Sequence, residues 1–247
     1  MTSDNNNKID NFLSVMIVNG AFSSIGNLRF RLEQIFKNID FKEKSVLEIG
    51  GGYGMFGFYA AINGAKNVVN LEPEGDGSTS GVIGKFKTLK DTLCINNIEL
   101  IASTFQNYNP LNKKFDIIIL YDSVNHLNEN ACIDLLKTPD SWIIYKNIFE
   151  KIGSLSNTNA KIIICDCSNK NFFPLLGLKN PFDRGIEWHK HQSPDVWSEL
   201  MEESGFCNPA ISWTTFNRFR KLGSFLLDNK YISYFLTSHF CLKMDKK

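Results

Sequence analysis

The 247-residue sequence predicts an α/β fold with a doubly wound, mostly parallel, seven-stranded sheet and an antiparallel final strand. Three observations lead to this prediction. Short apolar runs alternate with stretches of helical periodicity over residues 45–167, as crossover connections between parallel strands require. A glycine-rich turn follows the first of these runs. Two β-rich runs near the C-terminus have no obvious crossover helix between them, which favours an antiparallel pair.

Residues 1–44 are expected to form an N-terminal helical segment before the main domain, which spans residues 45–247. The first dozen residues are polar and rich in Asn, which predicts a frayed end. The stretch 28–40 repeats apolar residues at helical spacing, with Asn27 as the expected N-cap. We expect this helix to dock on the sheet and consider the segment a candidate lid.

The elements of the main domain follow one another in a regular order. Residues 45–50 predict a buried strand, and residues 67–72 predict a second one that ends in Glu72. A helix that starts after Ser193 and stops at Gly205 is well signalled by its Pro194 and its glycine. The remaining strands are expected at 98–102, 115–121, 161–167, 210–216 and 234–244, and the remaining helices at 56–65, 82–93, 131–137 and 141–152.

Composition and charge exclude several classes of protein. Lys+Arg 27 against Asp+Glu 26 gives a net charge of +1, so no basic surface for nucleic acid is expected. No long apolar run and no signal-like start are present, which predicts a cytoplasmic protein without a membrane partner. The six cysteines form no C-x-x-C pair, and we expect no metal. The oligomeric state stays open.

Two overlapping glycine patterns occupy residues 46–58, VLEIGGGYGMFGF. Gly52, Gly54 and Gly57 spell G-x-G-x-x-G, the fingerprint of dinucleotide-binding enzymes. Glu48 and Gly50, read with Gly52 and Gly54, spell the acid-x-G-x-G-x-G pattern of S-adenosylmethionine enzymes. Both patterns need a tight turn at the amino end of a helix, where the backbone approaches the ligand closely.

The position of Glu48 favours the methyl donor over the dinucleotide. A carboxylate two residues before the first glycine can pair with the ammonium group of a methionine-bearing ligand, whereas it would not attract the negatively charged pyrophosphate of a dinucleotide. The dinucleotide register also leaves Gly50 and Gly51 unexplained. Glu72 fits both ligands, because an acid at the end of the second strand accepts hydrogen bonds from ribose hydroxyls.

From about Ser45 to Met244 the chain resembles the class I S-adenosylmethionine-dependent methyltransferases. The resemblance rests on VLEIGGGYG, NLEPE, FDIIILYDSVNHL, ICDCS and ESGF. It implies the Rossmann-like methyltransferase fold and S-adenosyl-L-methionine as the cofactor. It also implies that the methionine part of the cofactor lies against the loop formed by Glu48, Gly50, Gly52 and Gly54, and that Glu72 binds the ribose. Ser103 holds the place after the third strand that often contacts the adenine edge in this family. The loop near Asp122, after the fourth strand, is expected to close over the cofactor.

The resulting functional prediction is methyl transfer to an O, N or C atom of a small-molecule acceptor, either a biosynthetic intermediate or a sugar-like compound. Two alternatives remain. The chain is an NAD(P)-dependent oxidoreductase if G-x-G-x-x-G is the true fingerprint, or a cofactor-binding partner subunit without chemistry of its own.

Histidines are the natural candidates for the general base that a hydroxyl or protonated amine acceptor requires. His126 follows the fourth strand at the carboxyl edge of the sheet, where ligands bind in this architecture. His189 and His191 lie near the end of a long loop. If that stretch is extended, Glu187, His189 and His191 point to one side. His239 is expected to be structural.

The region around residues 168–192 is expected to be an insertion that recognises the acceptor. It is long and combines Phe172, Phe173, Phe182 and Trp188 with Arg184. Long loops of this kind inside compact domains are usually functional. The basic run at 217–223 is expected to be a solvated connection.

Overall fold

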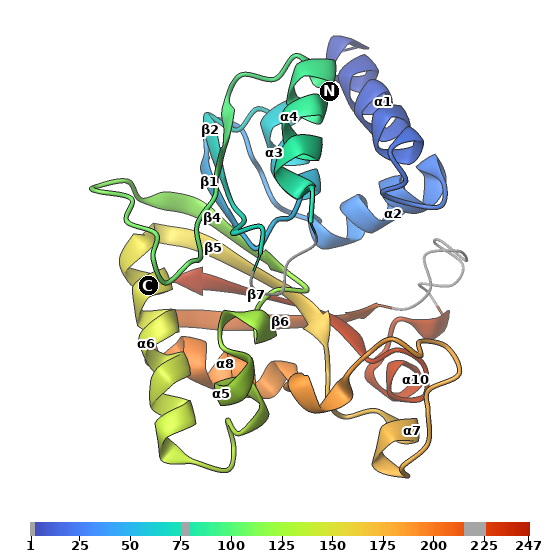
Figure 1. Ribbon diagram of the computed structural model, residues 1–247, viewed down its shortest axis with the longest axis vertical. Coiled ribbons are helices and arrows are strands. Elements are labelled where there is room, and N and C mark those ends of the chain that lie inside the picture. The colour runs from blue at the N-terminus through green and yellow to red at the C-terminus, as the bar shows by residue number, and fades with distance from the viewer. Residues whose placement is uncertain (1–2, 76–79, 215–225) are drawn as a thin grey trace. The chain divides into compact units, whose positions relative to one another are not determined.

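The computed structural model describes residues 3–75, 80–214 and 226–247. The chain divides into two compact units, Met1–Leu120 and Tyr121–Lys247, which are described separately below (Figure 1). The glycine-rich segment falls in the first unit, and all four histidines fall in the second. The predicted basic run at 217–223 lies outside the described residues.

The first unit is built on parallel strands with apolar, buried side chains. Its strands are β1 (Ser45–Ile49), β2 (Asn67–Leu71), β3 (Ile98–Ile101) and β4 (Phe115–Tyr121). β1 pairs in parallel with β2 and with β4, and β2 pairs in parallel with β3. The intervening helices are α3 (Met55–Ile62) and α4 (Val82–Leu93). All six lie where the sequence predicts them.

The prediction of a frayed N-terminus is wrong, because residues Ser3–Val18 form helix α1. Phe12, Leu13 and Met16 on this helix are fully buried, and α1 contacts α3 and α4. Their spacing, together with Ile9, is that of one helix face, which the Asn-rich start obscures. The buried apolar face, rather than the polar composition, decides the structure of this segment.

Helix α2 (Ile25–Ile35) begins earlier than the sequence predicts. Its N-cap is Ser24 and not Asn27, because the Ser24 side chain accepts a hydrogen bond from the backbone nitrogen of Asn27 at 3.3 Å. Leu28, Leu32 and Ile35 are buried, as the helical spacing indicates.

The second unit contains three strands, and the last of them along the chain lies between the other two. β7 (His239–Lys246) pairs antiparallel with both β5 (Ser156–Cys167) and β6 (Phe206–Thr214). The helices of this unit are α5 (Glu129–Ile133), α6 (Pro139–Leu155), α7 (Phe172–Leu175), α8 (Pro194–Glu203) and α10 (Lys230–Phe235), and short 3-10 turns occur at Asn125–Leu127 and Trp188–Lys190.

Several boundaries in this unit differ from the prediction. β5 begins at Ser156 rather than at 161, and β6 begins at Phe206 rather than at 210. Tyr234 and Phe235, expected at the start of the last strand, end the short helix α10 instead, and β7 begins only at His239. The aromatic run looks β-like in sequence, but Asn229 caps a helix there by accepting from the backbone nitrogen of Ile232 at 3.0 Å. The N-cap at Ser193 and the glycine stop at Gly205, with φ +82°, are as predicted.

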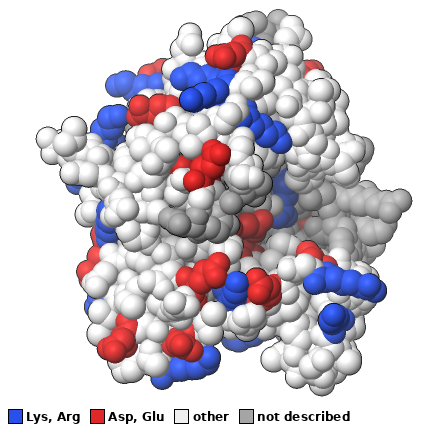
Figure 2. Space-filling model, in the orientation of Figure 1, with Lys and Arg blue, Asp and Glu red and all other residues white. Residues whose placement is uncertain are grey.

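The seven strands follow the order β3-β2-β1-β4-β5-β7-β6, with β7 antiparallel to its neighbours. This order confirms the predicted doubly wound, mostly parallel sheet with an antiparallel final strand. Acidic and basic side chains are interspersed on the face that Figure 2 shows. None of the helices in the described ranges is both long and apolar enough to cross a membrane.

Candidate active site

The glycine-rich turn connects β1 to α3 and lies close to Asn70 of β2 and Phe86 of α4. Gly50, Gly52 and Gly54 have φ values of 66°, 53° and 83°, which side chains disfavour. A Cβ on Gly51 would lie 1.9 Å from the Asn70 side-chain oxygen. A Cβ on Gly52 would meet nothing within 4 Å among the described residues. The loop therefore contacts β2 closely at Gly51, whereas the Cβ position of Gly52 has no neighbour in the described part of the chain.

Glu48 lies beneath this loop rather than on its open side. It is 1% exposed, and its Oε2 accepts a hydrogen bond from the Gly57 nitrogen at the start of α3 at 2.8 Å. Burial raises the pKa of the Glu48 carboxyl to about 8, the backbone donors of Gly57 and Phe56 oppose this rise, and the charge of Glu72 adds to it. The carboxyl supports the turn and the first turn of α3 from below.

Glu72 comes directly after β2 and is bonded to the open part of the loop. Its Oε2 accepts from the Gly52 nitrogen at 2.8 Å. Its Oε1 is buried and has no hydrogen-bond partner within the described part of the chain. Buried oxygens of this kind normally have donors, so Oε1 is suited to a hydroxyl of a bound ligand.

Several contacts of the loop escape the sequence analysis. The Asn70 amide donates to the Gly52 carbonyl oxygen at 3.0 Å, and a polar residue inside the apolar strand 67–71 is the signal that could have revealed it. Lys85 Nζ lies 4.1 Å from the centre of the Tyr53 ring and donates to the carbonyl oxygen of Asn19 at 2.9 Å. These contacts tie the loop to β2, α4 and the end of α1.

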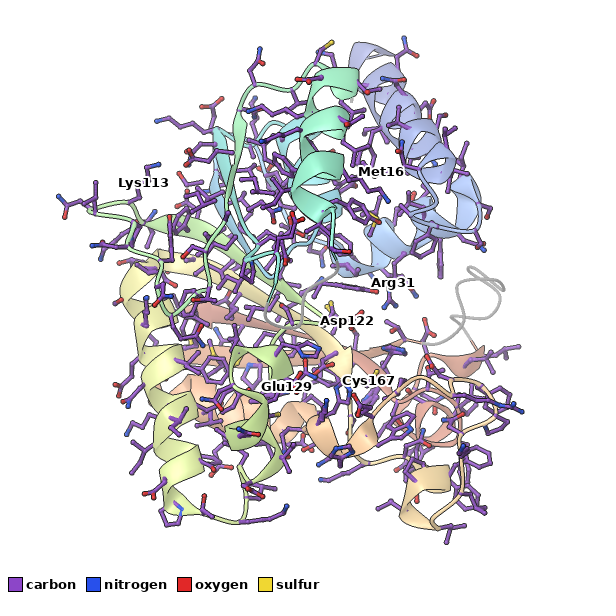
Figure 3. All side chains as sticks on the ribbon, in the orientation of Figure 1. Met16, Arg31, Lys113, Asp122, Glu129 and Cys167 are labelled. Atoms are coloured by element: carbon purple, nitrogen blue, oxygen red, sulfur yellow. The ribbon has the colours of Figure 1, made fainter. Side chains whose placement is uncertain are left out.

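Ser103 and Asp122 follow β3 and β4, as predicted. The Ser103 hydroxyl donates to the carbonyl oxygen of Thr104 at 3.1 Å. Asp122 has a φ of 47°, is exposed, and its backbone nitrogen donates to the carbonyl oxygen of Cys165 at 2.9 Å. Figure 3 labels Asp122 after β4 and Cys167 at the end of β5. Their roles toward a cofactor stay predictions.

The second unit contains a buried acid and histidine pair. Asp166, on β5, is 1% exposed, and its Oδ1 lies 2.9 Å from Nδ1 of His191. Burial lowers the pKa of His191, but the hydrogen bond to Asp166 and the charges of Asp166, Asp122 and Glu187 outweigh it, so that the pKa is raised above 6.5. Because the carboxylate accepts a hydrogen bond from Nδ1–H, the neutral ring has its free lone pair on Nε2.

The chain around His191 is held by contacts with α5. Gln192 Nε2 donates to the carbonyl oxygen of Cys132 at 2.6 Å, and the Cys132 thiol donates to the carbonyl oxygen of Lys190 at 3.2 Å. Trp188–Lys190 form a 3-10 turn, so this stretch is not extended and the condition under which Glu187, His189 and His191 would point to one side is not met. The turn closes because the Lys190 nitrogen donates to the carbonyl oxygen of Glu187 at 2.8 Å.

His126 and His189 lie in more exposed surroundings. The His126 side chain is 53% exposed, and its Nδ1 lies 2.6 Å from Oε1 of Glu129. Lys190 Nζ lies 3.2 Å from Oε2 of Glu129 and 2.9 Å from Oε2 of Glu187. His189 is exposed on the 3-10 turn. Of the three predicted histidines, only His191 is paired with a buried acid.

His239 faces β5 across the antiparallel pair, with its Nδ1 3.3 Å from the sulfur of Cys167. This position at the start of β7 agrees with a structural role. The described residues contain no group of three or more side chains that could hold a metal ion.

The predicted acceptor loop forms its own aromatic cluster. Phe172 and Phe173 on α7 pack against each other, and Phe172 lies 5.0 Å from Phe235 of α10 between ring centres. Phe173 packs against Phe182 with 6.2 Å between ring centres. These contacts join the loop to the helix before β7, a pairing that the sequence does not reveal.

Known proteins provide independent information on the family. The family model described as a methyltransferase domain matches residues 26–209. No curated protein matches the chain significantly. Among solved structures, an S-adenosylmethionine-dependent methyltransferase from Aquifex aeolicus is 16% identical with a TM-score of 0.54, covering 87% of this chain and 88% of that chain.

Two further structures are similar. An S-adenosylmethionine-dependent methyltransferase from Mesorhizobium loti is 12% identical with a TM-score of 0.59, covering 87% of this chain and 96% of that chain. Magnesium protoporphyrin IX methyltransferase from Synechocystis PCC 6803 is 11% identical with a TM-score of 0.53, covering 90% and 81%. At such low identity the likeness concerns the fold, while the family match spans most of the chain. The chain therefore belongs to the methyltransferase-domain family, within the class I S-adenosylmethionine-dependent methyltransferases.

Proposed function

We propose that this enzyme transfers a methyl group from S-adenosylmethionine to an O, N or C atom of a small-molecule acceptor, with His191 as the general base. The observation that carries the catalytic part is the 2.9 Å hydrogen bond between Asp166 and His191, with the acid fully buried. A carboxylate on Nδ1 fixes the ring and leaves Nε2 to accept a proton.

The residues of the glycine-rich turn fit the methyl donor. Glu72 Oε1 is a buried acceptor without a donor among the described residues, which suits a ribose hydroxyl. Gly52 presents a face that a Cβ would fill, and Gly50 and Gly54 share its left-handed backbone. S-adenosylmethionine supplies an electrophilic methyl group when bound, and this chain supplies the donors and acceptors that orient it.

The remaining predicted site residues keep secondary parts in this proposal. Glu48 acts through the loop that it supports, since its carboxyl lies against the Gly57 nitrogen. Ser103, after β3, stays a candidate for the adenine edge, and Asp122, after β4, a candidate for a closing loop. His126 and His189 stay candidates for contacts with the acceptor, and the segment 1–44 for a lid. We also infer that the enzyme acts in the cytoplasm on a free small molecule.

Adenosylhomocysteine, the product of methyl transfer, should raise the Tm of the wild-type protein in a saturable way, and NADH should not. A ligand that binds only the folded state stabilises it by mass action. In Gly52→Ala the stabilisation should disappear, because the new methyl group occupies the open face of the loop. A thermal-shift titration of both proteins with both ligands measures this.

Gly177→Ala is the matched control for that experiment. Gly177 has a φ of 71° and also has nothing within 4 Å of its Cβ position among the described residues, so its backbone strain is comparable. This variant should keep the full response to adenosylhomocysteine. Stabilisation of the wild type by NADH alone would replace the methyl donor with a nicotinamide cofactor.

Glu72→Gln should weaken adenosylhomocysteine binding by about 10- to 100-fold, since a hydrogen bond to a charged group is worth about 1.5–3 kcal/mol. The amide keeps one acceptor oxygen but loses the charge and one acceptor site. Isothermal titration calorimetry gives the affinity directly. Glu99→Gln, a 50% exposed side chain on β3, is the comparison and should leave the affinity unchanged. Equal affinities for wild type and Glu72→Gln would remove Glu72 from the ribose site.

A further inference from the structure

Three buried side-chain oxygens that belong to the loops after β4 and β5 or to the end of β5 have no hydrogen-bond donor among the described residues. Oδ2 of Asp166 and the side-chain oxygens of Asn125 and Asn169 are buried and have no partner among the residues that the structure describes. Asp166 and Asn125 are each only 1% exposed. Native proteins rarely leave such oxygens without hydrogens, so together they indicate a ligand that brings several donors.

Hydrogen bonds connect two of these residues to the segment around His191. Asp166 is bonded to its ring, and the Asn169 amide nitrogen donates to Oε1 of the adjacent Gln192 at 3.2 Å, which leaves the Asn169 oxygen on the other side of the amide. The Tyr145 hydroxyl lies 3.0 Å from the carbonyl oxygen of Asn125. The backbone nitrogen of Asp122, three residues before Asn125, donates to the carbonyl oxygen of Cys165, the residue before Asp166, at 2.9 Å, so the segment that contains Asn125 lies beside the end of β5.

The same region is negatively charged. Asp166 and Asp122 both act on His191 as negative charges, and no arginine or lysine among the described residues forms a salt bridge with Asp166. Lys190, the residue before His191, pairs with Glu129 and Glu187 instead. A positively charged ligand would complete this set of charges.

We propose that the methyl acceptor is an amine that binds as its protonated form to Asp166, Asn125 and Asn169 beside His191. This inference rests on the proposed methyl transfer and adds the class of acceptor. An ammonium group carries a positive charge and three N–H donors, so it can donate both to oxygens of this set and to Nε2 of His191. An alcohol brings one donor and would leave buried oxygens unsatisfied, at a cost in affinity.

His191, held by Asp166, removes a proton from the amine acceptor before methyl transfer. Nε2 of neutral His191 takes one proton from the ammonium, and the nitrogen thereby regains its lone pair. That lone pair forms the new N–C bond while the C–S bond of the methyl donor breaks with its electrons going to sulfur. The products are the methylated ammonium, adenosylhomocysteine and a protonated His191, which Asp166 stabilises.

The test is calorimetric titration of the full chain, saturated with adenosylhomocysteine, with three amines and their alcohols. The probes are butylamine, benzylamine and 2-phenylethylamine against 1-butanol, benzyl alcohol and 2-phenylethanol. At least one amine should bind saturably, and its alcohol should bind about tenfold more weakly or worse. In Asp166→Asn the preference for the amine should fall by about tenfold or more, with adenosylhomocysteine affinity unchanged.

Asp134→Asn is the matched control, since this exposed acid pairs with Lys137 away from the cluster, and it should retain the preference. Alcohols that bind as tightly as amines, no saturable binding of any amine, or a preference that survives Asp166→Asn would overturn the proposal. If Asp166→Asn does not unfold cooperatively, the amine and alcohol comparison on the wild type decides. Failure of adenosylhomocysteine to bind would instead contradict the proposed function.

Discussion

His191→Ala is expected to lower the turnover of methyl transfer by about 100- to 10,000-fold, the usual contribution of a general base. The affinity for adenosylhomocysteine should stay within about twofold of the wild-type value, because His191 holds a proton and not the cofactor. Formation of adenosylhomocysteine with the best-binding amine measures the turnover. Calorimetry measures the affinity.

His126→Ala and His189→Ala are the comparison variants, since both side chains are exposed. Each should lower turnover less than tenfold, well short of the loss expected for a general base. Equal turnover of His191→Ala and wild type would exclude His191 as the base.

The raised pKa of His191 also predicts a pH dependence. Turnover should increase as pH rises through a pKa above 6.5, because only the neutral ring accepts a proton. The contribution of the charged His191–Asp166 pair to the stability of the fold should be complete below about pH 6.5 and be lost as pH rises through the pKa of His191 in the folded state. In Asp166→Asn the inflection in turnover should move to lower pH, which a purely structural role of Asp166 would not produce.

The free energy of unfolding of Glu48→Gln minus that of the wild type is expected to be a few kcal/mol larger at pH 9 than at pH 5. Burial raises the pKa of Glu48 from 4.5 to about 8. Stability from the neutral carboxyl is therefore complete below 4.5 and is lost as pH rises through about 8. Each pH unit of this window corresponds to about 1.4 kcal/mol, and the amide does not ionise.

Urea unfolding followed by circular dichroism at pH 5 and pH 9 gives the free energies of unfolding. The comparison variant is again Glu99→Gln, whose side chain is half exposed and pairs with Lys113. Its difference from wild type should change little between the two pH values. A Glu48→Gln effect that is the same at pH 5 and pH 9 would show that the buried carboxyl does not titrate as described.

Local sequence signals were sufficient for the four parallel strands of the first unit. The strands at 45–49, 67–71, 98–101 and 115–121 are apolar, short and bounded by glycine or polar residues, and each lies where it is predicted. The same signals failed for α1, where a buried stripe containing Phe12 and Met16 outweighs an Asn-rich composition. They also failed at Tyr234 and Phe235, because β-like residues became helical once Asn229 capped them.

The sequence by itself determined the fold class, the family and the acid and glycine residues of the turn, because these depend on spacing between near neighbours. It also identified His191 as one of three candidate histidines. Only the tertiary structure distinguished them, since Asp166 lies 25 positions earlier in the chain and meets His191 through the packing of β5, α5 and the loop before α8. Burial and hydrogen-bond partners are set by residues distant in sequence, and they decide which carboxyl and which imidazole have a shifted pKa.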